Sequence, residues 1–351
     1  MVITGRIRFA DDSPCPPDVE VAVEMESVAC PLCGGQKYET VVATVDHLTR
    51  IGGEFHVVRC SRCELAFTNP RPTERSIGLF YPESYSPYSG HETGMLPRKT
   101  LRRRLERAVL QRYFDHPSDA AGPATAVMGL LGKAIIRNSR QRLPWIPFRP
   151  PGRMLDFGCG AGDFMKRMRE HGWTVEGIDV SPAMAQRLRE SAGLRVHVGS
   201  LPHPDVRPES FDAIVMWDSL EHVHCPRLVL QAAREALRTG GLLVVGVPNF
   251  ASWSRQHFRQ SWFGLELPRH LTHFTPATLS AMAELVGFRV LSLMQVGHGS
   301  TISKSAHRAA RCGSGSRWLR SLRSNRLSRP LSKWSERIGQ ADSMRMIAEK
   351  I

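Results

Sequence analysis

Strand and helix patterns alternate regularly from residue 153 to residue 296, and this alternation constrains the fold more than any other feature. Short apolar segments predict strands, and amphipathic segments between them predict helices. The strands are expected at 154–157, 174–178, 195–198, 213–217, 242–247 and 289–296, and the helices at 161–171, 182–191, 226–238 and 276–286. Because strand–helix–strand crossovers are right-handed, this order predicts an α/β fold with a parallel, doubly wound sheet. Ligands of such sheets bind beyond the carboxyl ends of the strands.

A glycine-rich turn follows the first of these strands. It runs from Asp156 to Asp163, reads D-F-G-C-G-A-G-D, and contains Gly158, Gly160 and Gly162. The dinucleotide fingerprint G-x-G-x-x-G would need a glycine where Asp163 or Met165 stands, so hydride chemistry on NAD is disfavoured. Glycines let the backbone approach a ligand closely, and the N-terminus of the next helix attracts a group such as a carboxylate.

The second strand ends in the carboxylate of Asp179, which can accept hydrogen bonds from a ribose diol. A site for a carboxylate beside a site for a ribose suits a nucleoside that carries an amino-acid tail. S-adenosylmethionine (SAM) has this structure, and we therefore expect SAM as the cofactor.

The motifs of this region resemble those of class I SAM-dependent methyltransferases. The resemblance rests on LDFGCGAGDF, VEGIDVS, VGSL and FDAIVMWDSLEHV, and it covers roughly residues 150–297. It implies a Rossmann-like, seven-stranded sheet. It also implies a cofactor site made by Asp156, Gly158, Gly160, Gly162, Asp179, Ser200, Leu201 and Trp217. Ser200 stands where many relatives have an aspartate that contacts adenine.

The flanking segments point to a narrower group within this family. CPLCG and CSRCELAFTNPRP precede the sheet, and PNFASWSRQHFRQSWFGLELPRHLTHFTPATL follows the fifth strand. They look like those of a bacterial subgroup often associated with cell-surface glycan and O-antigen clusters, while the EHV element is similar to that of quinone-ring O-methyltransferases. In these folds a seventh strand lies beside the sixth. DSMRMIAEKI at the C-terminus resembles it, which makes residues 298–341 a basic insertion.

Four of the eight cysteines stand in two C-x-x-C pairs, Cys30 with Cys33 and Cys60 with Cys63. Two such knuckles complete a tetrahedral Cys₄ shell, so the spacing predicts a structural Zn²⁺ in a zinc-ribbon-like module. The alternative is redox thiols, although a redox C-x-x-C is expected once and near a βαβ unit. The strands expected at 41–47 and 54–60 would form the hairpin of this ribbon.

Basic residues are concentrated in two stretches. The net charge is +14, yet residues 95–149 and 298–351 each hold 12 Lys/Arg against 3 Asp/Glu. These stretches are expected to be solvated surface or to contact phosphate, anionic lipid or an acidic partner. The domains predicted in chain order are a tail (1–27), the zinc-ribbon-like module and cap (28–94), a basic helical connector (95–149) and the SAM-binding domain (150–351).

Glu221 and His222 follow the fourth strand at its carboxyl end and are the predicted catalytic residues. A neutral histidine can accept the proton of a hydroxyl or carbon acid during methyl transfer. The alternative is that His222 has a structural role and that catalysis comes from proximity alone. By the family resemblance, His270 and His273 lie near the acceptor and are predicted to bind substrate.

The predicted activity is methyl transfer to a hydroxyl or carbon of a small molecule, such as a sugar or glycan precursor. No Asn-Pro-Pro-Tyr element for base amines and no Pro-Cys pair for cytosine follows the fourth strand. An RNA methyltransferase with a substrate-binding ribbon, and a ribbon scaffold without activity, remain alternatives. Apolar runs are far shorter than the roughly 20 residues that span a bilayer, and we expect a cytoplasmic protein with at most peripheral membrane contact.

Overall fold

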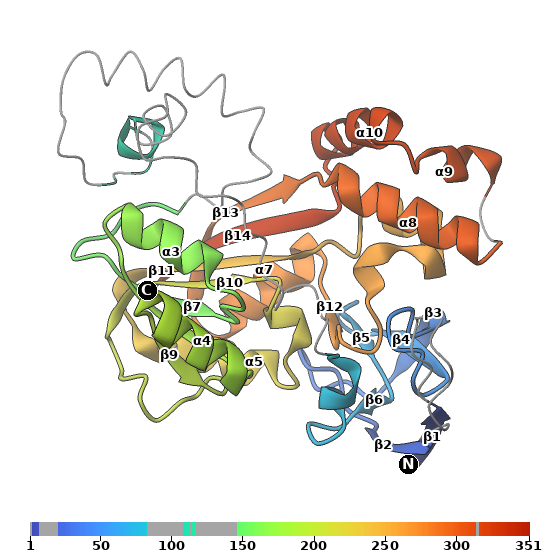
Figure 1. The fold of residues 1–351 in the computed structure, drawn as a ribbon, viewed down its shortest axis with the longest axis horizontal. Helices are drawn as coiled ribbons and strands as arrows, with labels where there is room; N and C mark the ends of the chain where they lie inside the picture. The colour runs from blue at the N-terminus through green and yellow to red at the C-terminus, as the bar shows by residue number, and fades with distance from the viewer. Residues whose placement is uncertain are drawn as a thin grey trace. The chain divides into compact units, whose positions relative to one another are not determined.

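The fold was analysed in a computed structural model of the chain (Figure 1). The residues described are 2–6, 20–82, 108–112, 114, 116, 146–313 and 316–351. Most of the predicted basic connector at 95–149 therefore lies outside the described residues, as does most of the predicted tail.

The chain packs into two compact units that each draw on distant parts of the sequence. The first unit comprises Met1–Tyr85, Asp218–Leu230 and Val245–Met346, and the second comprises Ser86–Trp217, Gln231–Val244 and Ile347–Ile351. Both units take residues from either side of position 150.

A seven-stranded sheet has the strand order β13-β14-β11-β10-β7-β8-β9. Its strands are β7 (Arg153–Phe157), β8 (Thr174–Asp179), β9 (Arg195–Val198), β10 (Phe211–Trp217), β11 (Leu237–Pro248), β13 (Phe288–Val296) and β14 (Ser343–Lys350). Strands β10, β7, β8 and β9 pair in parallel register. The predicted α/β class is confirmed, and β14 lies beside β13 as expected for the last strand.

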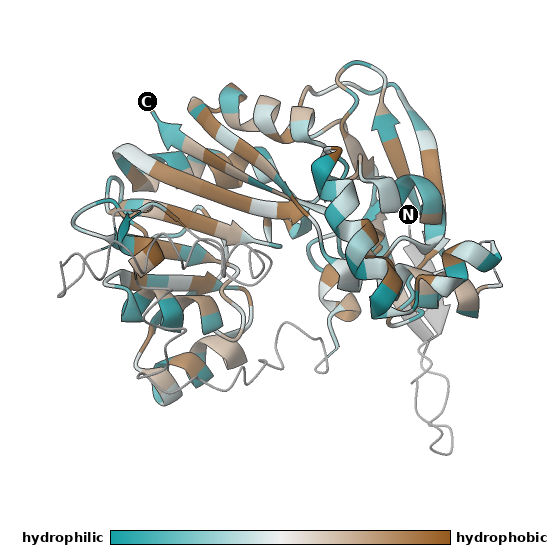
Figure 2. Cartoon of the chain, turned by 90° about the horizontal axis from the view of Figure 1, so that it is seen from above, coloured by the Kyte–Doolittle hydropathy of each residue, from teal (hydrophilic) through white to brown (hydrophobic). Residues whose placement is uncertain are grey.

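Helices occupy the predicted intervals between these strands. They are α3 (Asp163–Glu170), α4 (Pro182–Ala192), α5 (Pro226–Ala236) and α7 (Pro276–Leu285). Helix α4 begins at Ser181, whose side chain accepts a hydrogen bond from Met184 N, which is the usual N-cap arrangement. In the second unit the apolar faces of β7, α3 and α4 share one core that includes Met154, Met165 and Leu188. Apolar residues concentrate in the strands (Figure 2).

The first unit contains two further sheets. One has the order β12-β5-β4-β3 and is formed by β3 (Tyr38–Val45), β4 (Glu54–Cys60), β5 (Ala66–Thr68) and β12 (Thr272–His273). The other has the order β1-β2-β6 and is formed by β1 (Val2–Arg6), β2 (Glu20–Glu26) and β6 (Arg71–Pro72). The hairpin predicted from residues 41–60 is present as β3 and β4. Strand β12, some two hundred residues further along the chain, completes its sheet by pairing with β5.

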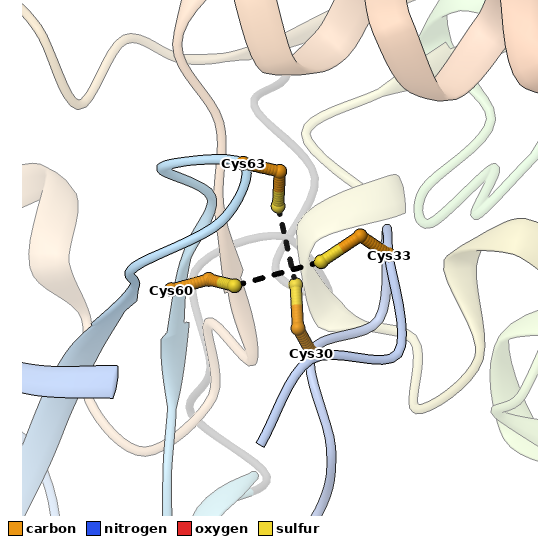
Figure 3. Close-up of side chains that lie close together, drawn as sticks. All are labelled: Cys30, Cys33, Cys60 and Cys63. Carbon is orange, nitrogen blue, oxygen red and sulfur yellow. Dashed lines mark hydrogen bonds between the residues drawn. The ribbon is translucent and has the colours of Figure 1, made fainter. Parts of the chain in front are cut away.

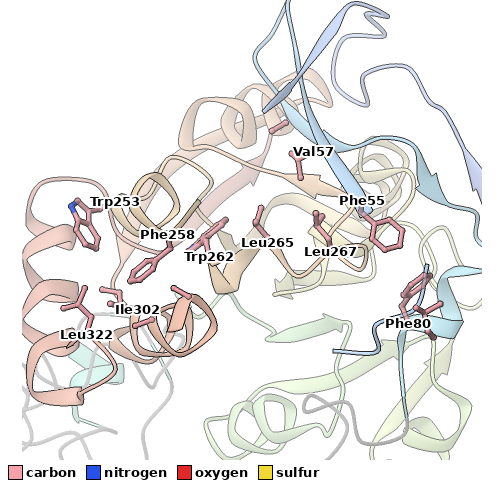
Figure 4. Packing of buried hydrophobic residues seen from close by; sticks show 14 of the residues in the cluster. Phe55, Val57, Phe80, Trp253, Phe258, Trp262, Leu265, Leu267, Ile302 and Leu322 are labelled. Atoms are coloured by element: carbon pink, nitrogen blue, oxygen red, sulfur yellow. The ribbon is translucent and has the colours of Figure 1, made fainter. Parts of the chain in front are cut away.

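One hydrophobic core joins the ribbon strands to later segments of the first unit (Figure 4). Phe55 and Val57 of β4 belong to the same buried cluster as Trp262, Leu265 and Ile302. These later residues come from the connection after α6 (Trp253–Phe258), from the short 3-10 helix η5 (Phe263–Leu265), and from α8 (Gly299–Arg311). The ribbon strands therefore bury their apolar side against segments that lie far away in sequence.

The basic insertion folds into three helices between β13 and β14. These are α8 (Gly299–Arg311), α9 (Arg317–Ser321) and α10 (Asn325–Arg337). None of the helices in the described parts of the chain combines the length and the apolar character that crossing a bilayer requires.

Candidate functional site

The glycine-rich turn after β7 adopts a backbone path that side chains would obstruct. Gly158, Gly160 and Gly162 have φ angles of 74°, 48° and 72°, in the region that favours glycine. A Cβ atom on Gly162 would also lie 2.7 Å from Leu188 Cδ2. Glycine is therefore required for the turn to keep this backbone path. Helix α3 begins directly after the turn, with its free N–H groups at the carboxyl end of β7.

Asp179 ties this turn to the end of β8. Its carboxylate accepts one hydrogen bond from Gly160 N at 2.8 Å and another from Ser181 N at 2.9 Å. Burial raises the pKa of Asp179, and these two backbone donors oppose the rise. Each carboxylate oxygen keeps a second lone pair, so Asp179 can position the turn and still accept a hydrogen bond from a hydroxyl.

Asp156 is a second buried carboxyl in the same region, at 2% exposure. Burial, together with the charge of Asp179, raises the pKa of Asp156 to about 8. A cationic ligand nearby would favour the ionised form and lower this pKa. The sulfonium and ammonium groups of SAM are cations of this kind.

The remaining predicted cofactor residues lie at the same edge of the sheet. Ser200 and Leu201 follow β9, and Leu201 is buried. Trp217 ends β10, and its ring meets that of Phe164 from α3 at 5.7 Å between centroids. The structure therefore brings the predicted cofactor residues together at the carboxyl ends of β7 to β10, within the second unit.

A cluster of histidines and carboxylates in the first unit includes Glu221, four residues after the end of β10. Glu221 and His222 lie in the 3-10 helix η3 (Leu220–His222). Glu221 is 1% exposed, and among the described residues neither of its carboxyl oxygens has a hydrogen-bond partner. The nearest ionisable partner is His270, whose Nε2 lies 4.0 Å from Glu221 Oε1. Burial, reinforced by the charge of Asp218, raises the pKa of Glu221 well above its usual value.

His222 is held through its Nδ1 atom. This atom lies 3.1 Å from the carbonyl oxygen of Arg269 and 2.9 Å from Tyr81 Oη. Because a carbonyl only accepts, Nδ1 carries the hydrogen and donates it, which leaves the lone pair on Nε2. Burial, with a contribution from His270, lowers the pKa of His222 to about 3. The ring is therefore neutral near pH 7.

The two histidines predicted to bind substrate have different surroundings. His270 lies with Glu221 and His222, and its ring centroid is 4.6 Å from that of His222. Its Nδ1 donates to the Gly264 carbonyl at 2.9 Å. His273 Nε2 instead contacts Thr68 Oγ1 at 3.2 Å, on the neighbouring strand β5. Burial lowers the pKa of both histidines, and His273 connects β12 to β5.

A buried ion pair supports this cluster, and the sequence analysis did not identify it. Both amino groups of Arg269 donate to the Asp46 carboxylate, at 2.8 and 3.1 Å, and one also donates to the Phe80 carbonyl at 3.0 Å. Both side chains of the pair are almost fully buried. Asp46 is the next-to-last residue of the strand predicted at 41–47, and Tyr81 lies in a segment predicted as a cap. Neither position carries a local pattern that indicates a partner at residue 222 or 269.

The four paired cysteines converge in the first unit (Figure 3). Sulfur atoms lie 3.4 Å apart between Cys30 and Cys63 and 3.5 Å apart between Cys33 and Cys60. A tetrahedral zinc ion with bonds of about 2.3 Å places its sulfurs about 3.8 Å apart, which is close to these values. Burial raises the pKa of Cys30 to about 11, and a bound cation would lower it because a coordinating thiol is deprotonated. The cluster fits a zinc module.

Comparison with known proteins identifies a methyltransferase domain in the chain. Residues 131–293 match the sequence model of a family described as a methyltransferase domain. A ubiquinone biosynthesis O-methyltransferase of Aeromonas salmonicida is 29% identical over 174 residues, which cover 44% of this chain and 72% of that protein. A protein of the same name from Cereibacter sphaeroides is 34% identical over 102 residues, which cover 28% of this chain and 41% of that protein.

The chain spans less than half the length of the Cereibacter relative and of a Pseudomonas syringae relative, at 41% and 47%. Among solved structures, a SAM-dependent methyltransferase from Mesorhizobium loti is 20% identical with a TM-score of 0.41, covering 63% of this chain and 100% of that one.

Proposed function

We propose that this chain, which contains a SAM-dependent methyltransferase domain, transfers the methyl group of SAM to a hydroxyl of a small molecule. A sugar or glycan precursor is the proposed class of acceptor. The hydroxyl is supported by the similarity to proteins named ubiquinone biosynthesis O-methyltransferase. The sugar is supported by the flanking sequence segments alone. A carbon acceptor would use the same arrangement.

The observation that carries the proposal is the buried carboxyl of Glu221, which has no hydrogen-bond partner among the described residues and lies beside the imidazole of His222. Burying a polar group without a hydrogen bond costs free energy, so such groups in folded proteins call for an explanation, and a role in catalysis is a common one. Here the carboxyl and the imidazole of His222 belong to a segment that directly follows β10. A substrate hydroxyl could use both as partners.

In the proposed reaction the acceptor oxygen attacks the methyl carbon of SAM from the side opposite sulfur. The oxygen–carbon bond forms, the carbon–sulfur bond breaks, and its electron pair goes to sulfur, which gives S-adenosylhomocysteine. The hydroxyl proton passes to His222 Nε2. As the oxygen forms its bond to the methyl carbon, positive charge develops on it and the hydroxyl proton becomes strongly acidic. Even an imidazole with a pKa of about 3 can then accept this proton. Positioning of the two reactants supplies the rest of the rate enhancement.

We assign Cys30, Cys33, Cys60 and Cys63 to one structural Zn²⁺. Four thiolates close a tetrahedral shell and leave no position for water or substrate, so the metal would stabilise the fold without entering the reaction. The spacing of the sulfur atoms supports this assignment.

The experiment is a radiolabelled methyl-transfer assay with SAM. It compares total cellular RNA with small-molecule and lipid-linked glycan extracts as acceptors. We expect label in a small or glycan-linked hydroxyl, and a loss of about 100-fold or more in turnover for His222→Ala, which is the usual contribution of a general base. His224→Gln is a matched control, because His224 Nε2 binds the Pro72 carbonyl outside the cluster. Label recovered stoichiometrically at one RNA position would overturn the proposal. Unchanged turnover in His222→Ala would remove the base assignment only.

A further inference from the structure

Helix α10 buries three serines and exposes two of its large apolar residues. Ser328, Ser332 and Ser335 are 0 to 1% exposed, whereas Leu327 and Trp334 are 49% and 45% exposed. A helix that only needed to pack on the protein would show the opposite pattern, since burying apolar surface is what stabilises packing. The outward face of α10 is therefore suited to an apolar environment outside the protein.

The exposed apolar residues follow helical spacing. Leu327, Trp334 and Ile338 recur at intervals of seven and four residues, which places them along one stripe. Trp318 of α9 is 54% exposed. The rings of Trp318 and Trp334 lie 5.8 and 6.5 Å from the ring of Trp253, so the two exposed indoles share one neighbour.

Positive charges accompany this stripe. Residues 316–338 hold seven Lys/Arg against one Asp/Glu, which is Glu336. Arg326, Lys333 and Arg337 of α10 are exposed and occupy positions next to the apolar stripe. We define the α9–α10 surface as the exposed apolar residues Trp318, Leu327, Trp334 and Ile338 together with these three cations.

We propose that the α9–α10 surface binds the interface of an anionic phospholipid bilayer. Interfacial helices combine an apolar face that contains Trp and Leu with Lys and Arg on the polar face, and they lie in the plane of the membrane. Indole rings favour the level of the headgroups, and long cationic side chains extend toward lipid phosphates. Acceptors carried by a membrane would then be concentrated near the enzyme, but the proposal does not depend on the methyl acceptor.

Two other occupants fit less well. A second copy of the chain would place two strongly positive surfaces against each other, which opposes association. RNA would bind the cations and stack on the indoles. Its phosphates and bases would gain little from contact with the exposed aliphatic side chains of Leu327 and Ile338. A bilayer is the partner that uses both the charge and the aliphatic side chains.

The test is vesicle flotation of the full-length protein. One set of vesicles contains phosphatidylcholine alone, and the other contains equal parts of phosphatidylcholine and phosphatidylglycerol. We expect flotation with the anionic vesicles only, and a loss of binding as salt is raised. Leu327→Ser should weaken the partition coefficient about tenfold or more, since a leucine side chain leaves the apolar region. Arg326→Gln combined with Lys333→Gln should weaken it about fivefold for each cation removed.

Matched controls distinguish binding through the α9–α10 surface from nonspecific binding of the protein to vesicles. Leu285→Ser changes a side chain of 53% exposure at the end of α7, and Arg187→Gln changes an exposed cation of α4. Both should float like the wild type. Equal binding to both kinds of vesicle, or wild-type binding by Leu327→Ser, would overturn the proposal. So would a protein that binds single-stranded RNA through the two α10 cations but binds neither vesicle. The urea midpoint of each variant shows whether it is folded.

Discussion

The turn after β7 and the histidine cluster after β10 are built in opposite ways. The turn and its partner Asp179 are contributed by 24 successive positions of the chain, Asp156 to Asp179, and hydrogen bonds to backbone N–H groups hold them. The histidine cluster combines side chains from residues 46, 81, 221–222 and 269–270, and it depends on contacts such as Arg269 with Asp46. The first arrangement is local and the second is tertiary.

This difference predicts different vulnerabilities. A site made of backbone groups in a tight turn changes mainly when a glycine or its carboxylate partner changes. A site assembled from distant segments depends on the core and on buried polar contacts that hold the segments together. The following predictions test this contrast in order of decreasing effect.

Loss of zinc is expected to have the largest effect, and it should reach the histidine cluster. Structural zinc supplies about 10 kcal/mol or more of folding free energy in small domains. Because β5 pairs with β12 and Phe55 shares a core with Trp262, changing all four cysteines to serine should expose residues 250–273 as well as 28–70. Hydrogen exchange by mass spectrometry measures this. Loss of protection confined to 28–70 would show that the ribbon folds separately.

Asp46→Ala should be the most damaging single substitution in the cluster. It removes the two-fold acceptor of the Arg269 guanidinium and leaves Glu266, 3.3 Å from Arg269 Nε, as the remaining carboxylate partner. Loss of one partner from a buried ion pair costs up to about 3 to 5 kcal/mol. Urea unfolding measures the loss, and methyl transfer should fall because the Arg269 carbonyl positions His222. The control is Glu39→Gln, which breaks an exposed pair with Arg59 worth at most about 1 kcal/mol. Equal effects from the two substitutions would contradict the role of the buried pair.

Asp179→Ala should weaken SAM binding about tenfold or more while leaving the histidine cluster intact. A hydrogen bond to a charged acceptor is worth about 1.5 to 3 kcal/mol, and Asp179 also holds the Gly160 N–H. Calorimetric titration with SAM measures the affinity. Binding within a factor of about two of the wild type would refute the ribose assignment.

Asp156→Asn should make the protein more stable than the wild type at pH 8. The folded-state pKa of Asp156 is about 8, against an ordinary value of 3.8. Ionisation therefore favours the unfolded chain increasingly as pH rises from about 4 to about 8, and the asparagine variant lacks this penalty. Urea midpoints should differ most at pH 8 and converge toward pH 4. A difference that does not depend on pH would show that Asp156 is not a buried carboxyl with a raised pKa.

Glu221→Gln extends the same comparison to the histidine cluster. The pKa of Glu221 is also raised, so this variant should likewise gain stability relative to the wild type as pH increases. It should keep its affinity for SAM, whereas Asp156→Asn should reduce it. Loss of SAM binding in Glu221→Gln would show that the two sites are not separate in function.

The sequence by itself determined the features that depend on neighbouring residues. Apolar periodicity predicted six strands and four helices to within about five residues, because side-chain direction repeats with the backbone geometry. The glycine turn and the two C-x-x-C pairs were equally visible, since each needs particular residue types at fixed short spacing. Cys30 and Cys63 meet at 3.4 Å, as the pairing of two knuckles requires.

Only the tertiary structure decided which distant groups meet. No local pattern links Asp46 to Arg269 or Tyr81 to His222, because these contacts depend on the packing of β4, β5 and β12 in one sheet and on their shared core. The same packing gave different side-chain partners to His270 and His273, which are close in sequence and equally polar. The imidazole of His270 lies 4.0 Å from Glu221, whereas that of His273 contacts the Thr68 hydroxyl. Local chemistry fixes what a side chain can do, whereas burial and long-range contacts fix its partner and its pKa.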